Sequence, residues 1–213
     1  MSLGRDPSGG PYPAKALMEP VILASGSPRR KEYFHLLGIP FTMMPSNIDE
    51  RFDENLSPEE AATSLARRKV ERLLELLRGR LPPWICAADT VVAVDGDILG
   101  KPADRAEAAI MLGRLRGREH AVVTAVALYN GREKHIDTRV VMSAVTFAEL
   151  SDGEIEWYLD TGEWQGVAGA YRIQGRAACF IPAIRGSYSS IVGLPLAELY
   201  AMLRENGYAY GAQ

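Results

Sequence analysis

The chain has 213 residues, of which 47% are hydrophobic and 24% are charged, and its formal net charge is −3. This length and composition predict one globular domain, or one domain with a pronounced second lobe, built around a sizeable core. The sequence has no basic excess, which argues against stable nucleic-acid binding. It also has no apolar run of membrane-spanning length and no evident signal peptide, so we expect a cytoplasmic protein without membrane partners.

Cysteine and histidine are scarce. Cys86 and Cys179 each lie in an apolar segment, which favours buried free thiols in a reducing compartment over a disulfide. The three histidines, His35, His120 and His135, do not have the spacing of a zinc site. We therefore expect neither a disulfide nor zinc to stabilise the fold.

The N-terminal part divides into a lead-in and a strand–loop–helix unit. Residues 1–20 are rich in proline and glycine without periodicity, so we expect a disordered lead-in before a single domain over 21–210. Residues 21–30 read Val-Ile-Leu-Ala-Ser-Gly-Ser-Pro-Arg-Arg, which predicts a strand, a bend and a helix over 28–37 with Ser27 as N-cap and Gly38 as stop. The apolar face of this helix should comprise Tyr33, Phe34, Leu36 and Leu37.

Two arginines occupy the first turn of that helix. The helix dipole disfavours each cation there by about 0.3–1 kcal/mol. A bound anion would remove this conflict, since backbone N–H groups and the guanidinium groups of Arg29 and Arg30 would both face it. The alternative is a pair of solvated arginines on an ordinary helix.

The next segments supply two more candidate groups. A short strand over 40–45 leads to Asp49 and Glu50, which are either ligands of a divalent cation or solvated loop acids. Ser57-Pro58-Glu59-Glu60 is a capping box that begins a helix reaching about residue 78. Lys69 lies in the apolar stripe of this helix, so it either snorkels to the edge of the core or reaches into a polar pocket.

Asp89 interrupts a strongly apolar strand over 84–94. A carboxylate is costly to bury unless it is paired, hydrogen-bonded or bound to a metal, so Asp89 is the best candidate for a catalytic or metal-binding acid. A structural, hydrogen-bonded aspartate is the alternative. Lys101 follows the turn at 95–97 and a short strand, which brings it back near Asp89 in position for an anionic ligand.

The C-terminal half predicts a mixed sheet. A helix over 104–115 precedes a hairpin with strands at 120–129 and 136–150 and a turn at 130–131, and a capped helix follows at 151–159. Residues 162–175 form a glycine-rich loop suited to close approach of a ligand, followed by a strand over 177–184 and a helix over 195–206. Alternating strands and helices with an antiparallel hairpin indicate an α/β fold.

Five motifs in this order resemble the Maf family of nucleoside triphosphate pyrophosphatases. They are Leu-Ala-Ser-Gly-Ser-Pro-Arg-Arg at 23–30, Ala-Asp-Thr at 88–90, Gly-Lys-Pro at 100–102, Ala-Gly-Ala-Tyr with Ile-Gln-Gly at 168–175, and Gly-Ser-Tyr with Gly-Leu-Pro at 186–195. The resemblance extends over about 21–207. It implies a two-lobed, ITPase-like fold with a twisted mixed sheet, flanking helices and a central cleft, commonly as a homodimer.

The resemblance also implies an activity, namely hydrolysis of a nucleoside triphosphate to the monophosphate and pyrophosphate with a divalent cation such as Mg²⁺, Mn²⁺ or Co²⁺. Asp89 matches the catalytic acid, whereas Arg29, Thr90 and Gln174 match positions for base selection. The other matched pocket positions are Ser25, Ser27, Arg30, Glu50, Lys69 and Lys101. The pattern resembles the branch that prefers dTTP and UTP.

The residue types suit this chemistry. Cationic side chains would offset the charge of a triphosphate, and a cation held by Asp89 and Glu50 would activate a water for attack at the α-phosphorus. Asp89 could instead take the water's proton directly, and the sequence leaves both roles open. The amide of Gln174 can both donate to and accept from the imide edge of uracil or thymine.

One stretch departs from the family pattern. Gly166 and Val167 stand where relatives usually have Asp and Lys, and Arg172 replaces a glycine. Arg172 is a candidate to restore the missing positive charge from a different backbone position. This departure leaves a pyrophosphatase of altered base range as one alternative to the dTTP/UTP pyrophosphatase. A second alternative is implied by the resemblance, because the Maf family is linked with arrest of septum formation and cell division: a nucleotide-binding regulator of these processes.

Overall fold

The computed structural model describes residues 18–51, 53, 55–79 and 82–210. Its centre is a seven-stranded mixed sheet with strand order β2-β1-β3-β5-β6-β7, in which β4 pairs with β3 off this path. β1 pairs in parallel with β2 and β3, and the remaining pairs are antiparallel. The strands are β1 Val21–Leu23, β2 Phe41–Met43, β3 Trp84–Val94, β4 Asp97–Leu99, β5 Glu119–Asn130, β6 His135–Thr146 and β7 Ala183–Arg185. The predicted mixed α/β architecture is confirmed.

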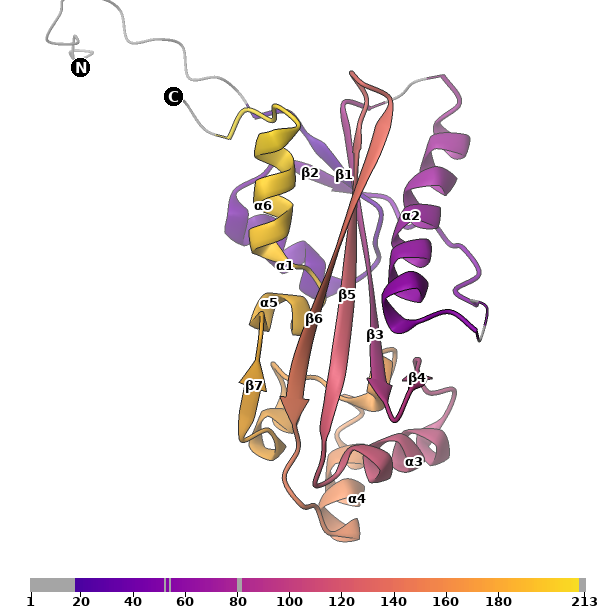
Figure 1. Ribbon diagram of the computed structural model, residues 1–213, viewed down its shortest axis with the longest axis vertical. Helices are drawn as coiled ribbons and strands as arrows, with labels where there is room; N and C mark the ends of the chain where they lie inside the picture. Colours follow the sequence, from indigo (N-terminus) through magenta and orange to yellow (C-terminus); the bar gives the residue numbers. More distant parts are fainter. Residues whose placement is uncertain (1–17, 52, 54, 80–81, 211–213) are drawn as a thin grey trace, which may run out of the picture.

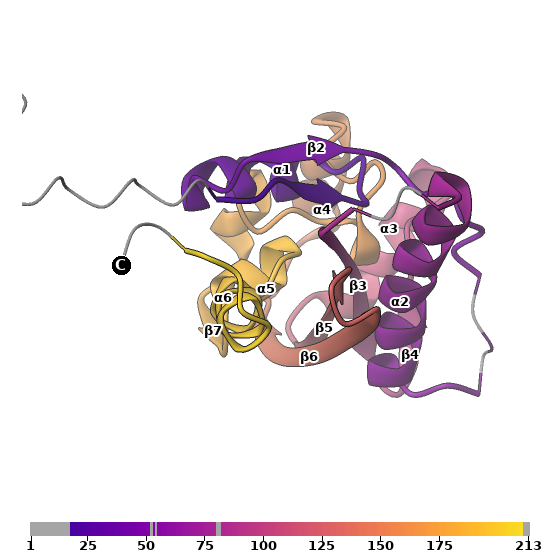
Figure 2. The same cartoon turned by 90° about the horizontal axis from the view of Figure 1, so that it is seen from above.

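Helices cover both faces of the long strands (Figure 1). Figure 2 shows α2 against one face and α6 on the opposite side of the sheet. The α-helices are α1 Pro28–Leu37, α2 Pro58–Leu77, α3 Arg105–Leu115, α4 Asp152–Asp160, α5 Tyr188–Val192 and α6 Leu196–Glu205, and the 3-10 helices are η1 Ala168–Ala170 and η2 Arg176–Phe180. Within the described part of the chain, no helix is long and apolar enough to cross a membrane.

β3 connects three hydrophobic clusters. Side chains in its first half point alternately to the two faces of the sheet. Trp84 and Cys86 belong to a cluster with α1 and α6, and Ile85 belongs to a cluster with α2. Its last residues enter a third cluster with α3 and α4. Both faces of β3 are therefore buried, which explains why its sequence is almost continuously apolar.

The edge of β3 that faces β1 is left open in the middle. β1 pairs with residues 84–86 and β4 with residues 92–94, so in the described structure residues 87–91 have no strand beside them on that edge. β5 pairs along the other edge throughout this stretch. Asp89 and Thr90 thus lie at a gap between two partner strands, and this gap is where the candidate site forms.

The predicted helix starts are confirmed, and the capping box of α2 offers a test. Glu60 N donates to Ser57 Oγ (3.2 Å), and Ser57 N donates to Glu60 Oε2 (2.9 Å). We expect Ser57→Ala to lower the free energy of unfolding by about 1 kcal/mol, because a helix N–H loses its acceptor. Urea denaturation measures this change. The control is Ser64→Ala inside the same helix, where alanine should be neutral or stabilising; equal losses in both variants would contradict a capping role.

Several local predictions need correction. Leu36 is 73% exposed rather than part of the apolar face of α1, since that helix buries Phe34. Cys179 is exposed, whereas Cys86 is buried, and both thiols are free as expected. The predicted strand over 177–184 is instead η2 followed by the short β7, and α5 was not predicted. Apolar composition over this stretch reflects packing onto the α3–α4 cluster, to which Ala177 and Phe180 belong.

Two boundaries also differ. The hairpin turn occupies residues 131–134, not 130–131, because Asn130 continues the strand and its Oδ1 accepts from Arg132 N (3.0 Å). The expected lead-in over 1–20 lies mostly outside the described residues, but residues 18–20 pack against the domain. Trp84 Nε1 donates to Glu19 Oε2 (2.8 Å), and Tyr208 Oη donates to the Glu19 carbonyl (2.7 Å).

Candidate active site

A cavity of about 720 Å³ opens at the gap beside β3. It is lined by the Ser-Gly-Ser loop and start of α1, by the segment after β2, by Lys69 of α2, and by the glycine-rich segment around η1. All ten residues proposed from the sequence contribute to this lining: Ser25, Ser27, Arg29, Arg30, Glu50, Lys69, Asp89, Thr90, Lys101 and Gln174. The structure therefore brings together groups from both halves of the chain.

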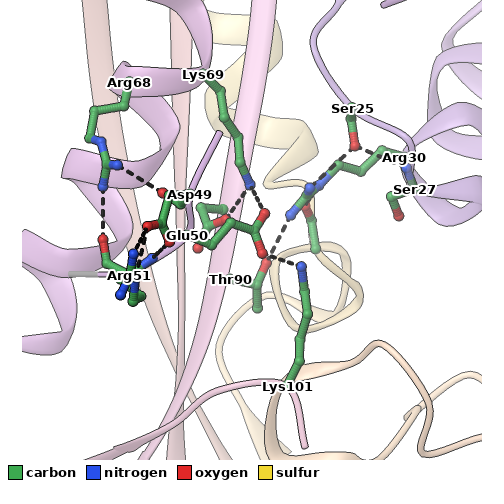
Figure 3. Close-up of polar contacts among 12 residues, drawn as sticks. Ser25, Ser27, Arg30, Asp49, Glu50, Arg51, Arg68, Lys69, Thr90 and Lys101 are labelled. Atoms are coloured by element: carbon green, nitrogen blue, oxygen red, sulfur yellow. Dashed lines mark hydrogen bonds and ion pairs between the residues drawn. The ribbon is translucent and has the colours of Figure 1, made fainter. Parts of the chain in front are cut away.

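A chain of alternating charges crosses the cavity (Figure 3). Lys69 Nζ donates to Asp89 Oδ1 (2.5 Å) and lies 2.8 Å from Glu50 Oε1. Lys101 Nζ pairs with the other carboxylate oxygen of Glu50. Four groups from four different segments thus form one network, in which Glu50 connects the two lysines.

Burial decides between the two alternatives for the Lys69 side chain. Lys69 and Asp89 are only 6% and 7% exposed, so Lys69 reaches into a polar pocket and does not snorkel to the surface. The Asp89 carboxylate is tolerated in the strand because Lys69 pairs with it. For Glu50, burial raises the pKa, but the charges and hydrogen bonds of Lys69 and Lys101 outweigh burial and lower the pKa to about 2.

Arg30 is held by the protein on three sides. Its Nε donates to the Gly193 carbonyl (2.7 Å), Nη1 to Ser25 Oγ (3.3 Å) and Nη2 to Thr90 Oγ1 (3.3 Å). Burial lowers the pKa of Arg30, while Asp89 and Glu50 oppose that change. Arg30 is consequently a fixed positive charge that ties α1 to β3 and to the segment before α6. The contribution of the Gly193 carbonyl was not predicted, because only the tertiary fold brings it there.

The start of α1 is strongly positive. Arg29 Nε donates to the Val192 carbonyl (3.3 Å), and burial, followed by the charges of Arg30 and Arg172, lowers the pKa of Arg29 to about 10. Among the ion pairs of the described residues, none involves these three arginines. Ser27 is the N-cap by position, yet its side chain makes no capping bond. This end of the cavity is thus suited to an anion.

The glycine-rich segment forms another part of the cavity wall. Gly169 has φ +66°, and a Cβ there would come within 2.8 Å of Val92, so glycine permits both the turn and its approach to β3. Gly169 N donates to the Gly100 carbonyl (3.0 Å), which couples this segment to the loop that carries Lys101. Gln174 lies on the same segment with an exposed side chain at the cavity lining.

Two residues near this wall were not singled out by sequence reasoning. Tyr171 lines the cavity, and its Oη lies 2.8 Å from His120 Nε2. Burial lowers the pKa of His120 to about 4, so the imidazole is neutral at pH 7. The one feature of the sequence that could have pointed to this contact is a histidine, His120, within an apolar strand. The residues around His120 do not indicate that Tyr171 is its hydrogen-bond partner.

The departure at Arg172 also lies at the cavity. Arg172 lines it, and its Nη2 donates to the Gln165 carbonyl (2.9 Å). Its charge acts on Arg29, as the lowered pKa of that group indicates. Arg172 therefore adds positive charge to the arginine end of the cavity.

The donor set suits a divalent cation that also binds a phosphorylated ligand. Asp89 and Glu50 both contact Lys69 Nζ, so their carboxylates face one region of the cavity. Across the described residues there is no group of three or more histidine, cysteine, aspartate or glutamate side chains arranged for a metal ion. Mg²⁺ is usually held by one or two carboxylates, with substrate phosphates and water completing its coordination, and two carboxylates fit that arrangement.

The mixed sheet and the arginine- and lysine-lined cavity with a buried acid define an α/β protein whose cavity is suited to an anion. Residues 20–206 match the family model described as Maf-like protein, so the chain belongs to the Maf family.

Relatives match over almost their whole length. The chain is 47% identical to a dTTP/UTP pyrophosphatase of Symbiobacterium thermophilum, over 90% of this chain and 96% of the relative. It is 44% identical to a dTTP/UTP pyrophosphatase of Pelotomaculum thermopropionicum, over 90% of this chain and 98% of the relative. Among solved structures, the Staphylococcus aureus Ham1 protein is similar with a TM-score of 0.41 and 15% identity, covering 62% of this chain and 73% of that one.

Proposed function

We propose that this protein is a nucleoside triphosphate pyrophosphatase that hydrolyses dTTP and UTP to the nucleoside monophosphate and pyrophosphate. The observation that carries the proposal is a cavity in which a buried carboxylate, that of Asp89, lies among lysine and arginine side chains. The names of the relatives, dTTP/UTP pyrophosphatase, support the same activity and substrates.

The charges are suited to a triphosphate. Arg29 and Arg30 lie at the start of α1, and Lys69 and Lys101 lie among the carboxylates of the acidic network, so the cavity offers cationic groups in both places. These groups would bind the phosphate oxygens and stabilise the negative charge that develops on the leaving pyrophosphate. Because Arg30 and Lys69 are already held by the protein, little reorganisation accompanies binding.

Hydrolysis then requires an activated water. In the proposed reaction the water oxygen forms a bond to the α-phosphorus, the bond between that phosphorus and the α–β bridging oxygen breaks, and pyrophosphate leaves. The Asp89 carboxylate, which pairs with Lys69, would orient the water and accept its proton. A Mg²⁺, Mn²⁺ or Co²⁺ ion held by Asp89 and Glu50 would lower the pKa of a bound water and neutralise part of the charge of the phosphates.

Base selection is assigned to the segment around Gln174, together with Arg29 and Thr90. We expect Gln174→Ala to lower kcat/KM for dTTP and UTP by about 10-fold to 100-fold, since each lost hydrogen bond to a uracil or thymine edge costs about 1–2 kcal/mol. ATP and GTP should change less. Steady-state kinetics on the four nucleotides measures the effect, with Gln165→Ala, outside the cavity lining, as the control. Equal weakening of all four nucleotides would count against base recognition by Gln174.

Pyrophosphate release from a panel of canonical and modified nucleoside triphosphates tests the function itself. Each nucleotide is assayed with Mg²⁺, Mn²⁺ or Co²⁺ and with a chelator. Cation-dependent turnover led by dTTP and UTP is the expected result. Faster turnover of a purine or modified nucleotide would indicate an altered base range, and binding without turnover would favour a regulatory role.

The proposal extends to the setting of the enzyme. We propose a single-domain protein that acts as a homodimer in the cytoplasm, without nucleic-acid or membrane partners. Two apolar side chains on β6, Val140 and Met142, are 42% and 54% exposed and are candidates for burial between subunits. Light scattering of the purified protein at several concentrations measures the oligomeric state, and a monomer throughout would contradict the dimer.

A further inference from the structure

Glu50 holds the charge network together, yet it lies on a segment without regular secondary structure. Its carboxylate contacts both Lys69 and Lys101. In the described part of the chain, residues 45–51 make no backbone–backbone hydrogen bond to any other element. A carboxylate on such a segment keeps a fixed position only if other contacts hold the backbone.

Arg68 supplies those contacts (Figure 3). Its Nη2 donates to the Asp49 carbonyl (2.8 Å), and its Nη1 donates to the Arg51 carbonyl (2.9 Å). One guanidinium group thus bridges the carbonyls on either side of Glu50. A planar guanidinium fork can hold two acceptors in a fixed geometry, whereas the single ammonium of a lysine cannot do so equally well.

The local contacts of the segment do not replace this attachment. Arg51 N donates to Asp49 Oδ1 (3.0 Å), and Arg51 Nε donates to Asp49 Oδ2 (2.7 Å). These bonds shape the turn, but they join residues within the segment and leave it free to move as a unit. Arg68 and Lys69 are consecutive residues of α2, so the helix fixes the backbone around Glu50 with one side chain and its carboxylate with the next.

We propose that Arg68 is a positioning residue of the active site, which holds the Glu50 carboxylate between Lys69 and Lys101 by bridging the carbonyls of Asp49 and Arg51. The expected effect of Arg68 on turnover rests on the proposed function. The hydrogen bonds from Arg68 to the two carbonyls are a property of the fold and do not depend on that function. Arg68 is not itself one of the residues that line the cavity, and its guanidinium group bonds only to the carbonyls that flank Glu50 among the described residues, so its effect on turnover passes through Glu50.

The kinetic test compares Arg68→Met with Arg67→Met. Methionine keeps much of the apolar stem and removes the fork. Among the residues that the structure describes, Arg67 pairs with Glu71 alone, on the exposed side of the same helix. We expect Arg68→Met to lower kcat by about 10-fold to 100-fold with a smaller change in KM, because displacements near 1 Å at a site have effects of this size. Arg67→Met should stay within about twofold, as expected for a surface pair.

A double-mutant cycle separates positioning from a general loss of structure. If Arg68 acts through Glu50, Arg68→Met in a Glu50→Gln background should lower kcat by no more than about twofold further. Arg68→Lys should lie between wild type and Arg68→Met. An undiminished effect of Arg68→Met in the Glu50→Gln background, or wild-type kcat in Arg68→Met alone, would overturn the inference.

Limited trypsin digestion tests the attachment without reference to activity. Trypsin cleaves after arginine, and the exposed Arg51 is a candidate cleavage site. To cleave there, trypsin must attack the Arg51 carbonyl, which accepts a hydrogen bond from Arg68 Nη1. The fragment ending at Arg51, followed by mass spectrometry, should form at least about 10-fold faster in Arg68→Met and at the wild-type rate in Arg67→Met. Unchanged cleavage would overturn the attachment, whereas a wild-type protein that hydrolyses no nucleotide would overturn the proposed function alone.

Discussion

Asp89→Asn is expected to lower kcat on dTTP and UTP by about 10³-fold while the protein stays folded and still binds nucleotide. Asn keeps the size of the side chain and can still accept a hydrogen bond from Lys69, so the buried contact with α2 remains. What is lost is the negative charge, and with it the group that accepts the water's proton or holds a cation. The loss should therefore appear in turnover rather than in binding.

The measurement combines pyrophosphate release with calorimetric titration of nucleotide in the presence of the chelator. Asp95→Asn is the matched control: Asp95 lies in the turn after β3, pairs with Arg118, and has φ +55°, which asparagine accepts readily. Asp95→Asn should retain wild-type kcat. Wild-type turnover in Asp89→Asn would remove Asp89 from the mechanism, and loss of binding together with turnover would indicate a structural role instead.

The largest expected effect on stability comes from Lys69→Met. Lys69 is the buried partner of Asp89 and also contacts Glu50, so its removal leaves a buried carboxylate without a counter-charge. Breaking a buried pair in this way costs about 3 kcal/mol or more. Turnover should also be lost, because the same lysine orients Asp89 and contributes positive charge to the cavity.

Thermal or urea unfolding measures this loss, with Lys101→Met as the control. Lys101 is half-exposed, so its pair with Glu50 should contribute less than about 1 kcal/mol. Lys69→Met combined with Asp89→Asn should recover part of the lost stability, since the unpaired charge is then absent. A small loss in Lys69→Met, equal to that in Lys101→Met, would contradict a stabilising buried pair.

The pH dependence of the Lys69→Met effect follows from Glu50. Its pKa in the folded protein, about 2, is below the ordinary value of 4.5, so its contribution to stability is present above pH 4.5 and is lost as the pH falls toward 2. Removing Lys69 removes part of the cause of that lowered pKa. The difference in unfolding free energy between wild type and Lys69→Met should therefore be larger at pH 7 than near pH 3.

The sequence predicted those features that depend on neighbouring residues. The strand, bend and helix of residues 21–38, the capping boxes at Ser57 and Ser151, and the long apolar strand with Asp89 were all identified. Caps, glycine stops and apolar periodicity act over a few residues, so the sequence contains their causes in full. The resemblance to the Maf family added Ser25, Ser27, Thr90 and Gln174 to the candidate site residues already found from local patterns, and all ten line one cavity.

Only the tertiary structure decided how distant residues meet. Leu36 is exposed because α1 packs through Phe34 onto the cluster that it shares with α6. Residues 177–184 form a 3-10 helix and a short strand because Ala177 and Phe180 pack onto the cluster with α3 and α4, and Cys179 is left exposed. The gap beside Asp89 arises from where β1 and β4 end on β3. Likewise, no local pattern indicates that Arg68 holds the backbone around Glu50, since this contact depends on how α2 is placed beside a segment that has no periodicity of its own.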